Sequence, residues 1–315
     1  MNSAPTFGEL FANWGIFSDA VATGTLAGAL LGFLGVQIVL RRMVFASSAI
    51  AQAAALGVAL SFWVPTLIDP IGHAASHAAD PSAHIVPLLF EPVIWALGAS
   101  LLATLAFISN PVKLHLTRES ILGVVFLVGA AGSVIIGDRI TQESHDLAAI
   151  LFGSAVVVAR ADLVLVASAT VVVLGAHLVL WRPLVFVAFD PIGARVQQLP
   201  VRSLNLFVFL AVGTAVALCT RALGALPVFA FSVLPAMAAL AVTRNLAVAF
   251  AVATVIGAVS GGAGYLVSFR AELPVGATQS ALALGILSLA LACQAISGFI
   301  NRPAGGHNNP PGGAR

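Results

Sequence analysis

Long stretches of apolar residues, separated by short polar segments, run through almost the whole chain. A transmembrane helix needs about 20 apolar residues to cross roughly 30 Å of hydrocarbon. Nine stretches approach or exceed that length: Ile16–Leu40, Val44–Pro65, Val86–Ile108, Ile121–Gly137, Asp162–Trp181, Leu204–Cys219, Leu226–Val242, Leu246–Ser268 and Ala277–Ile300. A shorter stretch, Leu147–Val158, has the length of a re-entrant or interfacial helix. The pattern therefore predicts an all-α polytopic membrane protein with about nine transmembrane helices and one short re-entrant helix.

The domain organisation follows from the same pattern. The apolar stretches use nearly all of residues 1–300, so we expect one transmembrane domain and no second domain. Residues 301–315 are rich in glycine, proline and asparagine, a composition typical of disordered segments. They are predicted to form a disordered cytoplasmic tail.

Composition excludes several classes of protein. Apolar residues make up 60% of the chain and charged residues only 8%, whereas a soluble domain has about 25% charged residues. This composition argues against a soluble enzyme. The single lysine, Lys113, follows Val112 rather than the glycine that a phosphate-binding P-loop requires. If ATP drives this protein, another polypeptide must therefore hydrolyse it, and we expect no enzymatic activity in this chain. The net charge of +2 argues against a nucleic-acid partner.

Loop charges predict the orientation in the membrane. When the loop after the first span is placed in the cytoplasm, ten of the 14 basic residues fall on that side: Arg41, Arg42, Lys113, Arg118, Arg182, Arg195, Arg202, Arg244, Arg302 and Arg315. Ten of the 12 acidic residues fall on the other side. The positive-inside rule favours this arrangement, which puts the N-terminus outside and the C-terminus inside.

Small and polar residues mark specific faces of the predicted helices. Gly24, Gly28 and Gly32 recur every four residues, a spacing that lets two helix backbones approach closely. In the second span, Ser48 and Gln52 place polar groups within hydrocarbon, together with Ser47. Such groups face either a neighbouring helix or a water-filled path. Interhelical hydrogen bonding and a translocation path are both consistent with them.

Histidines concentrate in the predicted outer loops. His73, His77 and His84 lie there near Asp80, and imidazole with carboxylate is a competent ligand set for Zn²⁺ and similar metals. An ordinary polar loop would have the same composition. His177 lies inside the fifth full span, where a helix contact is the simpler interpretation.

The largest predicted cytoplasmic loop, residues 182–203, contains a candidate docking element. Its centre, FDPIGARVQQLPVRS, predicts a short amphipathic helix with Pro191 in its first turn. A short helix on the cytoplasmic face suits docking into a groove of another protein, although a plain connector is also possible.

Five stretches in this order and spacing resemble one family. They are VLRRM…ALGVAL (Val39–Leu60), HDLAAILFGS with the following ADL (His145–Leu163), FDPIGARVQQLP (Phe189–Pro200), LGALPVFAFSVLPAMAAL (Leu223–Leu240) and ELPVGAT (Glu272–Thr278). The chain resembles the ABC-3 permeases, the membrane subunits of ABC importers for zinc, manganese or iron chelates. The resemblance implies an ABC permease bundle in a bacterial plasma (inner) membrane. It also implies a second permease copy, cytoplasmic ABC ATPases and a periplasmic or lipid-anchored metal-binding protein as partners, besides membrane lipid.

The resemblance also assigns roles to residues. It implies that Asp190–Pro200 is the helix that couples to the ATPase, and the residues expected to carry that role are Asp190, Gly193, Ala194, Arg195 and Gln198. The family usually has glycine where this chain has Gln198. In the second span the family usually carries Gly-Asp-x-x-x-His, and the Asp and His positions are Ser48 and Gln52 here. Another substrate, ligands relocated to the outer histidine loop, or a divergent paralogue would each explain that departure.

The predicted function is therefore a permease subunit for divalent metal ions, with zinc favoured over manganese or iron, and the metal is a transported substrate rather than a bound cofactor. One alternative is a secondary transporter, whose coupling ions would need acidic residues within the spans, where few are found. Another is an ABC permease for a siderophore or cobalamin.

Overall fold

The computed structural model describes residues 12, 14–68, 91–108, 117–139 and 158–300. Nine long helices account for most of this part of the chain: α2 (Trp14–Leu40), α3 (Val44–Ile68), α5 (Pro92–Ile108), α6 (Arg118–Arg139), α8 (Arg160–Val179), α11 (Val201–Leu223), α12 (Ala225–Val242), α13 (Leu246–Ala271) and α14 (Val275–Ile300). Eight of them are long and apolar enough to cross a membrane, and α5 is a shorter apolar helix of 17 residues. The prediction of about nine membrane helices is confirmed. The predicted re-entrant helix, except for Val158, and the tail 301–315 lie outside the described residues.

One predicted span ends earlier than expected. Helix α8 stops at Val179, and Trp181 begins a separate nine-residue helix, α9 (Trp181–Phe189). Pro183 explains the break, because it has no amide hydrogen to donate to the Val179 carbonyl and its ring would clash with that group in a continuous helix. The chain then forms α10 (Pro191–Val196), where the sequence predicts a short helix beginning at Pro191.

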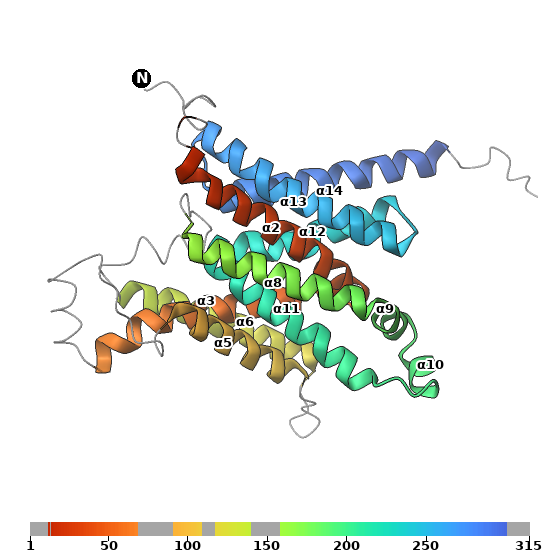
Figure 1. The fold of residues 1–315 in the computed structure, drawn as a ribbon, viewed down its shortest axis with the longest axis horizontal. Coiled ribbons are helices and arrows are strands. Elements are labelled where there is room, and N and C mark those ends of the chain that lie inside the picture. Colours follow the sequence, from red (N-terminus) through yellow and green to blue (C-terminus); the bar gives the residue numbers. More distant parts are fainter. Residues whose placement is uncertain (1–11, 13, 69–90, 109–116, 140–157, 301–315) are drawn as a thin grey trace, which may run out of the picture.

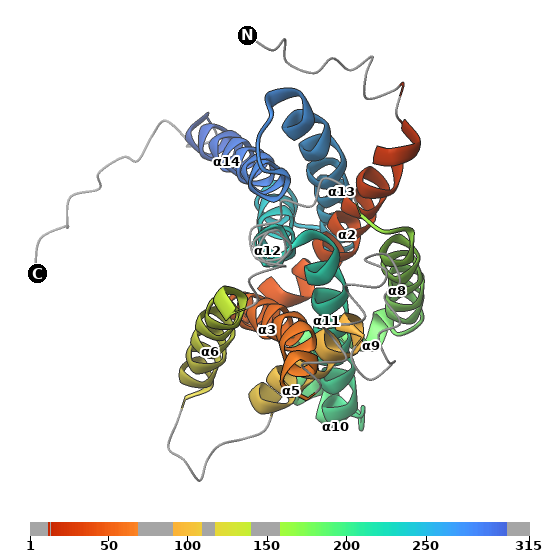
Figure 2. The same ribbon diagram turned by 90° about the vertical axis from the view of Figure 1, so that its left-hand side faces the viewer.

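Helix α2 occupies the centre of the bundle (Figures 1 and 2). It packs against α13 and α12 on one side and against α8 and α11 on the other. Helix α3 packs against α5 and α6, while α14 packs against α12 and α13. In Figure 2, α6 and α14 stand apart on the same side of the molecule, and α3 and α12 lie between them.

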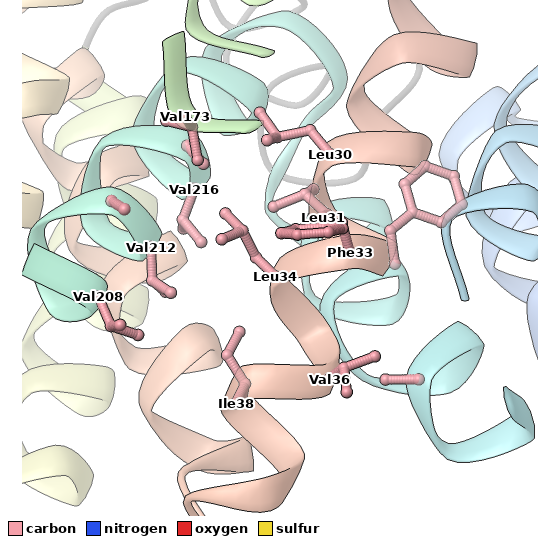
Figure 3. Close-up of a cluster of buried hydrophobic side chains, with 14 of the residues drawn as sticks. Leu30, Leu31, Phe33, Leu34, Val36, Ile38, Val173, Val208, Val212 and Val216 are labelled. Carbon is pink, nitrogen blue, oxygen red and sulfur yellow. The ribbon is translucent and has the colours of Figure 1, made fainter. Parts of the chain in front are cut away.

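Aliphatic side chains fill the contact between α2, α8 and α11 (Figure 3). Leu30, Leu31 and Leu34 of α2 are fully buried and lie opposite Val212 and Val216 of α11. Lipid tails are as apolar as leucine, so close van der Waals packing rather than exclusion from water holds such helices together. The size and shape of these side chains therefore determine how α11 is seated on α2.

Glycines set the distance between α2 and α13. A Cβ atom on Gly28 would lie 2.1 Å from the carbonyl oxygen of Gly257, and one on Gly257 would lie 2.0 Å from that of Gly28. Gly24 and Gly261 form an equivalent contact one turn away. The predicted role of the glycine repeat in close helix packing is confirmed.

Candidate functional site

A buried pair of serines joins α3 to α12 in the interior of the bundle. Ser232 of α12 donates a hydrogen bond of 2.9 Å to Ser47 of α3, and Ser47 donates in turn to the Val44 carbonyl. Both serines are fully buried. Helix α2 also reaches this point, because a Cβ atom on its Gly35 would lie 2.5 Å from the Ser232 carbonyl oxygen. Three helices therefore meet at one polar contact.

Pro235 lies three residues after Ser232 within α12. A proline inside a helix cannot hydrogen bond to the carbonyl four residues earlier, here that of Phe231. The serine pair is therefore next to a point where the hydrogen bonding of α12 is interrupted. Sequence analysis did not select Ser232, although it is the one side chain with a polar group in α12, and that isolation was a usable signal.

Ser48 and Gln52 lie on the same helix as Ser47. Ser48 is buried, and the side-chain oxygen Oε1 of Gln52 is buried without a hydrogen-bond partner among the described residues. Helix α6 packs against the backbone here, since a Cβ atom on Gly129 would lie 2.6 Å from the Gln52 carbonyl carbon. An amide oxygen without a partner can accept a hydrogen bond or ligate a cation.

The predicted outer metal site cannot be compared with the structure. His73, His77, His84 and Asp80 all lie outside the described residues. Within the described ranges, no three His, Cys, Asp or Glu residues come together in a way that would hold a metal ion.

His177 packs as a structural residue. Its side chain is buried between the rings of Phe33 and Phe207, at centroid distances of 5.7 and 5.0 Å. Nδ1 lies 2.8 Å from the Val173 carbonyl oxygen, so it is the nitrogen that carries hydrogen in the neutral ring. The interpretation of His177 as a helix-contact residue agrees with this packing.

Helix α10 is short but well capped. The Asp190 side chain accepts a hydrogen bond of 2.8 Å from the Gly193 amide, and Pro191 occupies the first turn, where no amide donor is needed. A side chain at position 193 would collide with this cap, because its Cβ would lie 2.2 Å from the Asp190 carboxylate. The sequence of this segment therefore specifies the start of α10 locally.

The end of α10 forms a Schellman motif. Gln198 has φ of 58°, its amide donates to the Arg195 carbonyl, and the Leu199 amide donates to the Ala194 carbonyl. Glycine adopts this left-handed conformation with least strain. The backbone thus explains why a glycine is usual at the position of Gln198.

The surface of α10 combines apolar and basic groups. Ile192 and Val196 are 75% and 80% exposed, and Arg195 is exposed beside them. Ala194, by contrast, is fully buried and anchors the helix to the bundle. An exposed apolar patch with a basic neighbour is typical of a protein-binding surface.

A partly buried arginine connects α11, the helix that follows α10, to the start of α3. Arg41, in the turn between α2 and α3, donates hydrogen bonds to Asn205 of α11 and, at 3.4 Å, to Gln37 of α2. Its partial burial lowers the pKa of the guanidinium group below its ordinary value, because desolvation disfavours the charged form. A displacement of the first turn of α11 would therefore pull directly on the turn that leads to Ser47 and Ser48.

At the opposite end of the bundle, an ion-pair network joins three elements. Arg221 of α11 lies 2.9 Å from Asp162 at the start of α8 and 3.7 Å from Glu91 just before α5. These side chains are partly exposed, so the network is worth little stability by itself. It does tie together the ends of three helices on the side that the charge pattern predicts to be outside.

Comparison with known proteins identifies the family. The model of the ABC 3 transport family matches residues 14–294. The chain belongs to the ABC 3 transport family. The resemblance inferred from the five sequence stretches is thereby confirmed, and the chain is a multi-pass membrane protein with the fold of an ABC permease.

Relatives in this family cover most of the chain. An uncharacterized membrane protein of Synechocystis is 27% identical over 260 residues, covering 82% of this chain and 84% of the relative. The manganese transport system membrane protein MntC of Halalkalibacterium halodurans is 22% identical and covers 96% of this chain and 95% of its own. The high-affinity zinc uptake system membrane protein ZnuB of Haemophilus influenzae is 21% identical over 71% of this chain and 77% of its own length.

A solved structure has the same fold. PsaBC from Streptococcus pneumoniae, in complex with Fab, superposes with a TM-score of 0.77 at 19% identity and covers 94% of this chain and 100% of that chain. Helix α10 lies in the segment that the sequence resemblance predicts to be the ATPase-coupling helix. It is exposed and capped, and α11, the next helix, is hydrogen bonded through Asn205 to Arg41 in the turn before α3.

Proposed function

We propose that this chain is the membrane-spanning permease of an ATP-driven importer of divalent metal ions. The observation that carries the proposal is α10, a capped helix with exposed apolar side chains at one end of a bundle that belongs to the ABC 3 transport family. ATP hydrolysis would take place on a partner, since the one lysine of the chain has no glycine-rich phosphate loop around it.

The expected orientation places α10 in the cytoplasm. Arg41, Arg182, Arg195, Arg202 and Arg244 all belong to the end of the bundle that carries α10, as the alternating direction of the helices requires. An excess of arginine in short loops is the charge pattern of cytoplasmic ends. A cytoplasmic ATPase would then receive Ile192 and Val196 in a groove of its surface.

The substrate path is proposed to follow the α3–α12 contact, with Ser47, Ser48 and Gln52 on α3 and Ser232 on α12. These residues offer hydroxyl and amide oxygens. Oxygen ligands suit Mn²⁺, whereas Zn²⁺ prefers imidazole and thiolate ligands. The sequence alone favoured zinc. We instead propose Mn²⁺ as the first metal to test, because several relatives carry manganese transport in their names, although ZnuB is named for zinc uptake.

A second copy of the permease is expected to complete the path. Helices α6 and α14 stand apart on the side where α3 and α12 lie between them (Figure 2). Both carry exposed apolar side chains, among them Leu127 and Ile135 of α6 and Leu284 and Leu289 of α14. A second copy on that side would enclose the α3–α12 contact between two permeases. An extracytoplasmic metal-binding protein would deliver the ion at the end of the bundle opposite α10.

The test of this proposal is ATP-dependent uptake by a reconstituted complex. The permease, co-purified with its ATPase and placed in proteoliposomes, should accumulate radioactive Mn²⁺ when ATP is supplied. The double variant Ile192→Asp, Val196→Asp should lose the ATPase on co-purification, because carboxylates would be buried without partners in an apolar groove. The matched control is Leu273→Asp, which alters an exposed apolar residue in the loop at the opposite end. Uptake driven by an ion gradient without ATP would contradict the proposal and favour a secondary transporter.

We also propose that the outer loop captures the metal through His73, His77, His84 and Asp80. A triple variant with alanine at the three histidines should reduce Mn²⁺ or Zn²⁺ uptake at limiting metal. Wild-type uptake should fall as the pH drops below about 6.5, because only neutral imidazole binds metal. Unchanged uptake in the variant at every metal concentration would show that the loop is a connector.

A further inference from the structure

A groove runs along the outside of the bundle between α8, α9 and α13. It has a volume of about 910 Å³, and Phe33 of α2 forms part of its floor. The ring of Trp181 packs edge-on against Phe250 at a centroid distance of 4.8 Å, so an aromatic pair closes the groove between α9 and α13. Its lining residues come from α2, α8, α9 and α13, and none comes from α3 or α12, whose contact is proposed as the substrate path.

The lining of the groove is apolar along its length and basic at one end. Leu178, Val179 and Val255 are strongly exposed on its walls. The hydroxyl group of Thr254 is already engaged, because it donates a 2.7 Å hydrogen bond to the Phe250 carbonyl. Among the described residues that line the groove, Arg182 is the single charged side chain. Arg244 precedes α13 at the same end of the bundle, so the positive charge there is not confined to Arg182.

The depth of the groove matches one leaflet of a bilayer. From Ala247 to Val255, both of which line it, α13 rises about 12 Å at 1.5 Å per residue. Half of the hydrocarbon core is about 15 Å thick. Trp181 and Arg182 lie at the end of the groove nearest α10, at the junction of α8 and α9. Both residue types are typical of the membrane–water interface. A molecule that fills the groove would therefore have an apolar tail of about one leaflet in length and a head next to an arginine.

We propose that this groove binds one anionic phospholipid from the leaflet on the α10 side, with its phosphate at Arg182 and an acyl chain along α8 and α13. Basic pockets between transmembrane helices recognise anionic lipid head groups through charge. An acyl chain in the groove would fill the space between α13 and the α8–α9 junction and so hold α9, which leads directly into α10.

Native mass spectrometry of the full chain tests the proposal. The protein is released from micelles that contain equal amounts of palmitoyl-oleoyl phosphatidylglycerol and phosphatidylcholine. One phosphatidylglycerol should remain bound to each wild-type chain in preference to phosphatidylcholine. Arg182→Gln should lower the retained phosphatidylglycerol about fivefold and abolish most of the preference, since one basic side chain near the lipid surface has an effect of that order. Val255→Trp, which fills the groove, should reduce retention of both lipids.

Two matched controls keep the result specific to the groove. Arg202→Gln removes an exposed arginine at the same end, and Val171→Trp enlarges an exposed residue of α8, and neither position lines the groove. Both should retain phosphatidylglycerol as the wild type does. Equal retention of the two lipids by the wild type, or the same loss in Arg202→Gln as in Arg182→Gln, would overturn the proposal. Disulfide cross-linking between two Val255→Cys chains in a background without native cysteines would show a second copy in the groove and would overturn it as well.

Discussion

The contact between α2 and α13 makes the sharpest prediction about stability. In Gly257→Ala, the new methyl group would start 2.0 Å from the Gly28 carbonyl oxygen and 2.7 Å from its carbon. Ordinary contacts begin at 3.4 Å, so the two backbones would have to separate by about 1.4 Å. Neither clashing atom belongs to a flexible side chain, and the strain therefore cannot be relieved by a change of rotamer.

The magnitude follows from two opposing effects. Overpacking a well-fitted contact costs about 1–3 kcal/mol. Alanine in place of a helical glycine recovers up to about 1 kcal/mol of helix propensity. Because the backbones separate, the neighbouring Gly24–Gly261 contact would also loosen. We expect a net loss of about 1–2 kcal/mol.

Thermal stability of the detergent-solubilised chain measures this loss. The fraction that remains monodisperse by size-exclusion chromatography after heating should fall at a temperature several degrees below that of the wild type. Gly175→Ala is the matched control, because a Cβ atom there meets nothing within 4 Å, and it should be neutral or slightly stabilising. The double variant Gly28→Ala, Gly257→Ala should lose less than the sum of the single variants, since both widen the same gap. If Gly257→Ala and Gly175→Ala lose their monodisperse fraction at the same temperature, the close approach of α2 and α13 is wrong.

Three further predictions concern α10 and its connection to α3. Gln198→Gly should raise the melting temperature, because it relieves a left-handed conformation that costs a non-glycine residue about 1–2 kcal/mol, and an unchanged melting curve would refute the Schellman geometry. In a background without native cysteines, Gln197→Cys should react with an impermeant thiol reagent only from inside and Leu273→Cys only from outside; reversed labelling would invert the proposed orientation. Arg41→Ala and Asn205→Ala should each lower the melting temperature and weaken ATP-driven uptake. Because both variants remove the same hydrogen bond, their effects should be non-additive in a double-mutant cycle. Simple additivity would show that the two side chains act independently.

Part of the candidate site could be read from the sequence because it is specified locally. The Asp-Pro start and the Gly193 position of α10 depend on contacts within a few residues, so the short helix was predictable from its own segment. Ser48 and Gln52 were identifiable because polar side chains are rare in that span. Ser232 was missed although it is the one polar side chain of α12, and its pairing with Ser47 could not be predicted because the two lie 185 residues apart and no local pattern connects them.

The sequence by itself determined that the chain is a membrane protein of about nine helices with most of its arginines on one side. Hydrocarbon offers no hydrogen bonds, so each apolar stretch must satisfy its own backbone as a helix, whatever surrounds it. Which helices are neighbours was decided only by the tertiary structure. The spans are apolar on all sides, so their periodicity does not distinguish a lipid-facing side from a buried one. The central position of α2, the link from Arg41 to Asn205 and the groove at Arg182 arise from the fit of glycines, valines and leucines between segments far apart in the chain, and that fit exists only once the helices are packed.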